Sequence, residues 1–195
     1  RDNRVKARIA SHGIDCDLKA GHLEAAWAPK DFDAMKREAE YLAARFDYQS
    51  EIVAKADMAA HIASPLYHGG VYDPPGGHFH PLNYAIGLAA AAEAAGVRIL
   101  EGRRAEPIRG ANPGNLFIDD ATIEARYFID ATDSWIGDLE PDLGRYTVPI
   151  MNYNIATAPL ADADALLPSD AAVAGSRFVL NYFRLSAGKR LIFGG

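Results

Sequence analysis

Cysteine is almost absent from this sequence. Cys16 is the only cysteine among 195 residues, which excludes an internal disulfide framework and any metal site built mainly from thiolates. A single thiol is typical of proteins from a reducing compartment. We therefore expect a cytoplasmic protein in which Cys16 is buried and inert.

The sequence also lacks an excess of positive charge and any long apolar run. The net charge is -6, with Lys and Arg scattered among 26 acidic residues, so no basic face is available for a phosphate backbone and nucleic acid is not expected as a partner. The longest apolar run, residues 88–95, contains Glu93 and is too short to cross a bilayer. The N-terminus has no signal-peptide pattern, and we expect no association with a membrane.

Several signatures of catalysis are missing as well. There is no G-x-S-x-G nucleophile motif, which disfavours a hydrolase, and the six histidines lack ligand-like spacing, which disfavours a metal site. No G-x-G-x-x-G dinucleotide fingerprint is present. The chain opens on Arg1 without an initiator Met and stops at the pair Gly194-Gly195. We expect both ends to be cuts that leave apolar sheet edges uncovered and lower the solubility.

What is present is ordinary globular composition, 49% hydrophobic and 24% charged, with three helical patterns. Apolar residues recur at helical spacing from Pro29 to Phe46. A short helix is predicted over residues 57–62, where Asp57 can cap. An Ala-rich helix is predicted over residues 82–95, with Pro81 in its first turn and Gly96 as its C-cap. Residues 5–10 are ambiguous.

The remaining patterns favour strands and turns. Residues 69–81 are dense in turn formers. Strands are predicted over residues 14–27 (one or two), 97–100, 105–108, 116–118, 121–125, 127–133, 147–157, 178–185 and 190–193, with a hairpin turn at residues 186–189. The strand at residues 127–133 ends in small and polar residues, as ligand-binding strand ends of α/β sheets do. Without regular strand-helix alternation, this mixture predicts an α+β or composite α/β fold with two interleaved domains.

Five segments, taken in order, resemble one family. They are residues 13–18 with Gly21-His22-Leu23, residues 67–70 (Tyr-His-Gly-Gly), residues 77–84 (Gly-His-Phe-His-Pro-Leu-Asn-Tyr), residues 176–186, and Phe193-Gly194-Gly195. Together they resemble the D-amino-acid oxidase superfamily of FAD-dependent oxidoreductases, and within it the bacterial gamma-glutamylputrescine oxidase-like proteins. The likeness runs through nearly all of the chain, and the conserved order of the segments carries it.

The resemblance implies a partial FAD-binding domain of the glutathione-reductase type, interleaved with a substrate domain built on an antiparallel sheet. By position, residues 1–76 and 138–195 would belong to the substrate domain and residues 77–137 to the FAD-binding domain. The chain would end at its re-entry into the flavin site. The fingerprint that normally holds the pyrophosphate would lie outside this sequence.

The resemblance also implies site residues, although it names no catalytic group. The implied cofactor-binding residues are Ala105, Ala131, Thr132, Asp133, Trp135, Gly194 and Gly195. Asp133 departs from the glycine or asparagine that is common in the family, and its carboxylate would repel a pyrophosphate. The alternative for Asp133 is a strand end that caps a helical turn, and the alternative for Ala105 is a plain edge strand.

The expected substrate-binding residues are Tyr182, Arg184 and His80. Alternation puts Tyr182 and Arg184 on one sheet face, where an aromatic ring and an arginine can hold a carboxylate and a cationic or apolar chain. The alternative is that Tyr182 packs and Arg184 pairs with a surface acid. For His80, a surface or hydrogen-bonded role is the alternative to a place beside the flavin.

The expected function is FAD-dependent oxidation of the C–N bond of an amine or amino acid to an imine, with oxygen as acceptor. The cofactor would carry the chemistry, while the protein would orient the substrate and exclude water. The alternative is a truncated or cofactor-free pseudoenzyme that acts as a binding or structural module. The sequence leaves open the exact amine and the oligomeric state.

Overall fold

The computed structural model describes residues 4–106, 114–119, 121–136 and 139–195. The chain forms two compact units, one of Arg1–Ala95 with Asn152–Gly195 and the other of Gly96–Met151. The expected boundaries between the substrate domain and the FAD-binding domain, after residues 76 and 137, divide the chain by function and remain a prediction. The second boundary lies outside the described residues. Within the described ranges, no helix is long and apolar enough to span a membrane.

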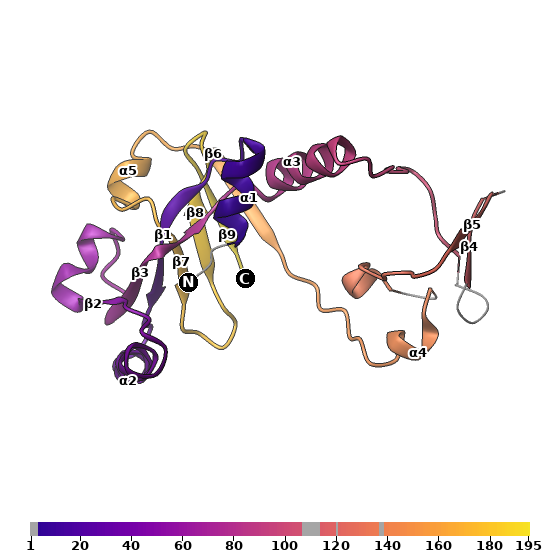
Figure 1. Cartoon of the computed structure of the whole chain (residues 1–195). Coiled ribbons are helices and arrows are strands. Elements are labelled where there is room, and N and C mark those ends of the chain that lie inside the picture. The colour runs from indigo at the N-terminus through magenta and orange to yellow at the C-terminus, as the bar shows by residue number, and fades with distance from the viewer. Residues whose placement is uncertain (1–3, 107–113, 120, 137–138) are drawn as a thin grey trace. The chain divides into compact units, whose positions relative to one another are not determined.

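The first unit is built on a seven-stranded sheet with the order β2-β3-β1-β7-β8-β9-β6 (Figure 1). Its strands are β1 (Lys19–Ala25), β2 (Glu51–Ala54), β3 (Gly69–His78), β6 (Asn154–Pro159), β7 (Ala172–Gly175), β8 (Tyr182–Leu185) and β9 (Arg190–Gly194). All neighbours pair antiparallel except β1 and β7, which pair in parallel. This parallel pair joins the early segment of the chain to the last third in one mixed sheet.

The core lies on the face of the sheet that carries the alternating apolar residues of three neighbouring strands. Leu23 of β1, Val173 of β7 and Leu185 of β8 are buried in one cluster. The 3-10 helix η1 (Lys55–Ala60) and the short helix α5 (Ala163–Leu166) cover this cluster through Met58 and Ala163, with Leu167 directly after α5. Successive side chains of a strand point to opposite faces, so the residues between the core positions face away from this cluster.

Three longer helices belong to the same unit, and two were predicted. Helix α2 (Pro29–Phe46) matches its prediction, and its first turn is closed by the Asp31 carboxylate, which accepts a hydrogen bond from Ala28 N–H at 3.2 Å. Helix α3 (Pro81–Ala94) is followed by Gly96 at a positive φ of 92°, as a C-terminal glycine requires. The ambiguous N-terminal residues form helix α1 (Arg4–His12), which contacts α3.

The glycine- and proline-rich residues before α3 form a long strand instead of the expected series of turns. Strand β3 continues through Asp73-Pro74-Pro75-Gly76-Gly77 to His78, and its register against β1 shifts between Ala20 and His22. A bulge of this kind accommodates residues that cannot donate to a regular ladder, which is why the prolines did not end the strand. Residues 14–27, for which one or two strands were expected, contain one strand, β1.

The second unit consists of the hairpin β4 (Gly114–Ile118) and β5 (Ala121–Ala125), the 3-10 helix η2 (Asp133–Trp135) and the short helix α4 (Pro141–Gly144). The hairpin was predicted. Ala105 forms an isolated bridge to Ile118, and the rest of the strand predicted over residues 105–108 falls outside the described residues from residue 107 on.

Two strands predicted in the second unit are wrong. Residues 97–100 form no strand, and Val97 and Leu100 are exposed. Residues 127–133 likewise form no strand, and Ile129 is 91% exposed. An apolar run becomes a strand only where a neighbour pairs with it, and no described residue does so here. The strand predicted over residues 147–157 begins only at Asn154, where β9 provides that neighbour.

Candidate functional site

Tyr182 stands at the start of β8 with its ring over a glycine of the next strand. Phe183 and Leu185 pack on the core, so alternation places Tyr182 and Arg184 on the opposite face, as predicted. Tyr182 pairs with Gly194 of β9, and a Cβ added at Gly194 would overlap the tyrosine ring. Only a residue without a side chain therefore lets Tyr182 lie flat across β9.

The hydroxyl of Tyr182 reaches beyond β9 to residues at the start of the edge strand β6. It donates a short hydrogen bond to Oδ1 of Asn152. The same oxygen accepts a hydrogen bond from Nδ2 of Asn154 at 3.3 Å, and Asn154 is the partner of Gly194 in the sheet register. Neither asparagine was predicted. The pattern Asn152-Tyr153-Asn154 gives no signal until the pairing of β6 with β9 is known.

Gly195 continues this region beyond β9. Its N–H donates to the carbonyl of Tyr153 at 3.2 Å, and its carbonyl accepts from Tyr153 N–H at 3.4 Å. The backbone of the two predicted glycines is thus fixed beside the edge strand, and Gly195 is exposed. Tyr182, Gly194 and Gly195, three residues predicted to form the site, therefore lie together on one end of the sheet.

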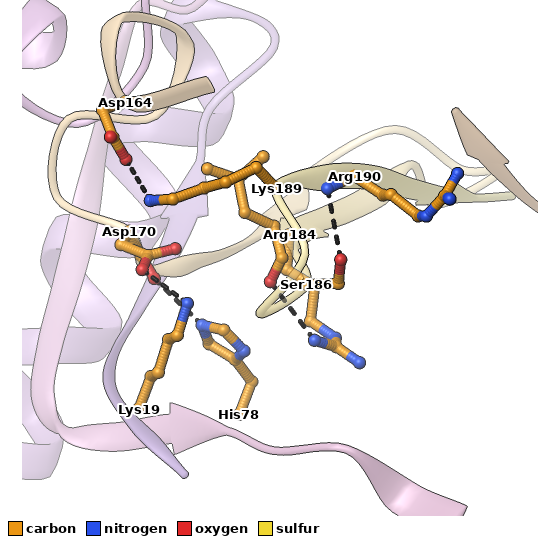
Figure 2. A network of polar contacts seen from close by, with 9 residues as sticks. Lys19, His78, Asp164, Asp170, Arg184, Ser186, Lys189 and Arg190 are labelled. Carbon is orange, nitrogen blue, oxygen red and sulfur yellow. Dashed lines mark hydrogen bonds and ion pairs between the residues drawn. The ribbon is translucent and has the colours of Figure 1, made fainter. Parts of the chain in front are cut away.

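Arg184 lies two residues beyond Tyr182 on the same face of β8, with its guanidinium close to a buried histidine (Figure 2). Its Nη1 donates to the carbonyl of Leu185 at 3.3 Å. His78 is only 7% exposed, and its Nε2 lies 2.9 Å from the carbonyl oxygen of Asp170. Burial lowers the pKa of His78, and the positive charge of Arg184 acts in the same direction, whereas the hydrogen bond to Asp170 raises it. The net lowering of its pKa favours the neutral form of the imidazole beside Arg184.

Ion pairs flank this histidine and fix the loops around it (Figure 2). Lys19 of β1 pairs with Asp170 at 2.7 Å, and Lys189 in the turn after β8 pairs with Asp164 at 2.5 Å. The Lys189 pKa is raised by its hydrogen bond to Asp164. These acids are bound to lysines, and Arg184 forms no ion pair with an acid among the described residues, contrary to the alternative of a surface pair.

His80, the third predicted substrate residue, caps a helix in this structure. Its Nδ1 accepts a hydrogen bond from Asn83 N–H at 3.3 Å at the start of α3, and its own N–H donates to the carbonyl of Cys16 at 2.6 Å. Cys16 is buried, as predicted, and burial raises the pKa of its thiol. No described contact links His80 with Tyr182 or Arg184. A role for His80 in substrate binding remains a prediction.

The other predicted cofactor residues lie in the second unit. Oδ1 of Asp130 accepts hydrogen bonds from the N–H and hydroxyl of Thr132, at 2.9 and 2.6 Å, which lower the pKa of the Asp130 carboxyl. Asp133 begins η2 at a positive φ of 51°, and the ring of Trp135 is 89% exposed. Ala131 and Asp133 are also exposed.

Taken one unit at a time, some of these residues have side chains of a kind that suits a flavin cofactor. In the second unit the exposed indole of Trp135 can stack on a ring system. In the first unit the backbone of the exposed Gly195 is open to close approach, whereas Tyr182 and Asn154 cover Gly194. The exposed carboxylate of Asp133 does not suit a pyrophosphate. Within the described ranges, no group of three His, Cys, Asp or Glu residues could hold a metal ion.

The mixed sheet with its flanking helices is shared with several solved structures. Solved structures with the same fold include glycine oxidase from Bacillus cereus, with a TM-score of 0.78 and 17% identity over 98% of this chain and 53% of the other. L-proline dehydrogenase from P. horikoshii matches with a TM-score of 0.77 and 16% identity over 96% of this chain and 51% of the other. These likenesses show the fold.

Sequence comparison gives the family. The model of the FAD dependent oxidoreductase (DAO) family matches residues 2–195. Gamma-glutamylputrescine oxidoreductase of Escherichia coli K12 is 31% identical over 194 residues, which are 98% of this chain and 46% of that protein. A probable oxidoreductase, OrdL, of Rhizobium meliloti is 32% identical over 187 residues, 94% of this chain and 44% of that protein. The chain belongs to the DAO family of FAD-dependent oxidoreductases and spans less than half of the length of these relatives.

Proposed function

We propose that the whole protein oxidises the C–N bond of an amine or amino acid to an imine, with FAD as cofactor and oxygen as the terminal acceptor. The match of residues 2–195 to a family of FAD-dependent oxidoreductases supports this proposal most strongly. Bound FAD would supply the oxidising power by accepting a hydride from the carbon that bears the nitrogen. The chain's own residues would hold the substrate and exclude water from it.

The proposed substrate is an elongated amine of the gamma-glutamylputrescine type, the class named for the relative in Escherichia coli. Tyr182 and Arg184 are proposed to contact it from β8, with His80 as a further contact. An arginine suits the carboxylate of such a molecule because its guanidinium binds carboxylates in two parallel hydrogen bonds. Cytoplasmic location is proposed from the single thiol.

The proposed cofactor contacts follow the same division of the chain. The residues proposed to contact the cofactor are Gly194 and Gly195 of the first unit and Ala105, Ala131, Thr132, Asp133 and Trp135 of the second. Asp133 is the least suited of them to a place beside the pyrophosphate, because its carboxylate would repel the phosphates.

An absorbance spectrum of the full-length protein, followed by titration with FAD, tests the cofactor. Visible flavin bands that persist through gel filtration, and peroxide release on addition of gamma-glutamylputrescine, would support the proposal. A full-length protein that binds no flavin would sink the oxidoreductase function and favour a cofactor-free binding module.

A further inference from the structure

Whether the hydroxyl of Tyr182 donates or accepts a hydrogen bond decides which part of the substrate this residue can contact, a question that rests on the proposed function. Three neighbouring strands place Tyr182, Gly194 and Asn154 in one row of the sheet register. The ring of Tyr182 crosses the bare backbone of Gly194. Its hydroxyl thereby reaches Asn152, on the far side of β9.

Asn152 takes the only proton that the Tyr182 hydroxyl can donate. The acceptor is the amide oxygen Oδ1 of Asn152, and the amide of Asn154 donates to the same oxygen at 3.3 Å. Both bonds therefore run toward this oxygen, the acceptor that Tyr182 and Asn154 share. A phenol has one O–H and two lone pairs, so the hydroxyl of Tyr182 is left with acceptor capacity alone.

An ionised carboxylate has only acceptors and therefore cannot bind to a hydroxyl whose proton is already donated. An amine or ammonium group has N–H donors and can. We propose that Asn152 sets Tyr182 as an acceptor, so that Tyr182 binds an N–H of the substrate amine and rejects its carboxylate. Asn152 is in this sense a positioning residue, acting through Tyr182.

Arg184 offers hydrogen-bond donors where Tyr182 offers an acceptor, and its guanidinium lies on the side of β8 away from β6. A guanidinium only donates, and Figure 2 shows the guanidinium of Arg184 beside His78 of β3. In the strand order, β3 lies on one side of β8 and β6 on the other. Tyr182 leans toward β6, so the acceptor for an N–H group and the donors for an anion are separated across β8. An elongated substrate with an amine at one end and an anion at the other matches this arrangement.

Calorimetric titration of the full-length protein with two probes of equal length, n-butylamine and butyrate, tests the proposal. Calorimetry detects binding whether or not flavin is present, and the flavin spectrum of the same sample reports separately on the proposed function. Tyr182→Phe removes the hydroxyl and leaves the ring. We expect butylamine to bind about tenfold more weakly to this variant, the loss typical of one hydrogen bond to a charged group, with the affinity for butyrate unchanged.

Two substitutions of the exposed Asn152 separate positioning from structure. Asn152→Leu removes the acceptor and frees the proton of Tyr182, so the ratio of butylamine to butyrate affinity should fall several-fold. Asn152→Asp keeps an acceptor at this position and should preserve the preference for the amine. The proposal is overturned if neither probe binds the wild-type protein, if Tyr182→Phe weakens butyrate instead of butylamine, or if Asn152→Leu and Asn152→Asp leave the same ratio.

Discussion

At the scale of single residues, the buried His78 links the titration of one side chain to the stability of the fold. Its pKa lies below the ordinary value of about 6.5 because the imidazole is buried, and the charges of Arg184 and Lys19 act in the same direction. At pH values well above 6.5 the imidazole is neutral in both the folded and unfolded states. Below that pH the unfolded chain binds a proton that the folded chain resists, so the stability falls as the pH falls toward the folded pKa.

His78→Gln should flatten this pH dependence. Glutamine can still donate to the carbonyl of Asp170 but does not titrate. The urea midpoint of the wild-type protein should drop between about pH 7.5 and pH 5, and the drop should be smaller in the variant. Some slope will persist, because burial also lowers the pKa of His61. Equal slopes in the two proteins would show that the protonation of His78 is not coupled to folding.

Single residues also differ in how far the sequence could predict their place in the candidate site. Alternation along β8 was enough to place Tyr182 and Arg184 on one face, because it is a local property of one strand. Asn152 was missed because its contact with Tyr182 requires β8, β9 and β6 to lie in a particular register. Such pairing joins residues about 30 positions apart and leaves no local trace in the sequence.

At the scale of elements, the start of α2 is tied to the end of β7 through one carboxylate. Oδ2 of Asp31 accepts hydrogen bonds from Ala28 N–H at 3.2 Å and from the hydroxyl of Ser176 at 2.6 Å. Asp31→Ala should lower the free energy of unfolding by about 1–2 kcal/mol. The matched control is Asp33→Ala, which removes an exposed ion pair with Lys36 and should cost much less than Asp31→Ala. Equal losses in urea unfolding would contradict this role of Asp31.

Leu23 of β1 should be sensitive to truncation. Leu23 is fully buried in the cluster shared by β1, β7 and β8, so Leu23→Ala should reduce the free energy of unfolding by about 3 kcal/mol. Leu82→Ala is the control, because Leu82 is 61% exposed, and its effect should stay within about 0.5 kcal/mol. Denaturant unfolding monitored by circular dichroism measures both. A loss below about 1 kcal/mol at Leu23 would argue against this packing.

Elements that depend on local signals were predicted, and those that depend on a partner were not. Local sequence signals were enough for three elements: the apolar periodicity of α2, the cap residues of α3 and the hairpin of β4 and β5. Residues 97–100 and 127–133 have strand-like composition, but no described strand pairs with them. Strand β3 carries two prolines and still forms, because the shifted register against β1 tolerates them.

At the scale of the whole molecule, large apolar side chains are exposed in both units. Phe178, Trp135 and Ile150 are each more than 80% exposed, and contiguous exposed apolar surface promotes association. We expect this 195-residue chain, prepared alone, to self-associate and to bind a hydrophobic dye, whereas the full-length protein should do so much less. Sedimentation at several concentrations measures the difference. A chain that stays monomeric and binds no dye would contradict this expectation.

The family and the fold are shown, whereas the chemistry is proposed. That chemistry requires flavin to bind beside the end of the sheet that carries Tyr182. The most direct measurement is anaerobic mixing of the FAD-loaded full-length protein with gamma-glutamylputrescine while the flavin absorbance is recorded. We predict that the flavin is bleached by the substrate and that its colour returns when oxygen is admitted. A bound flavin that no amine or amino acid reduces would contradict the proposed C–N oxidation.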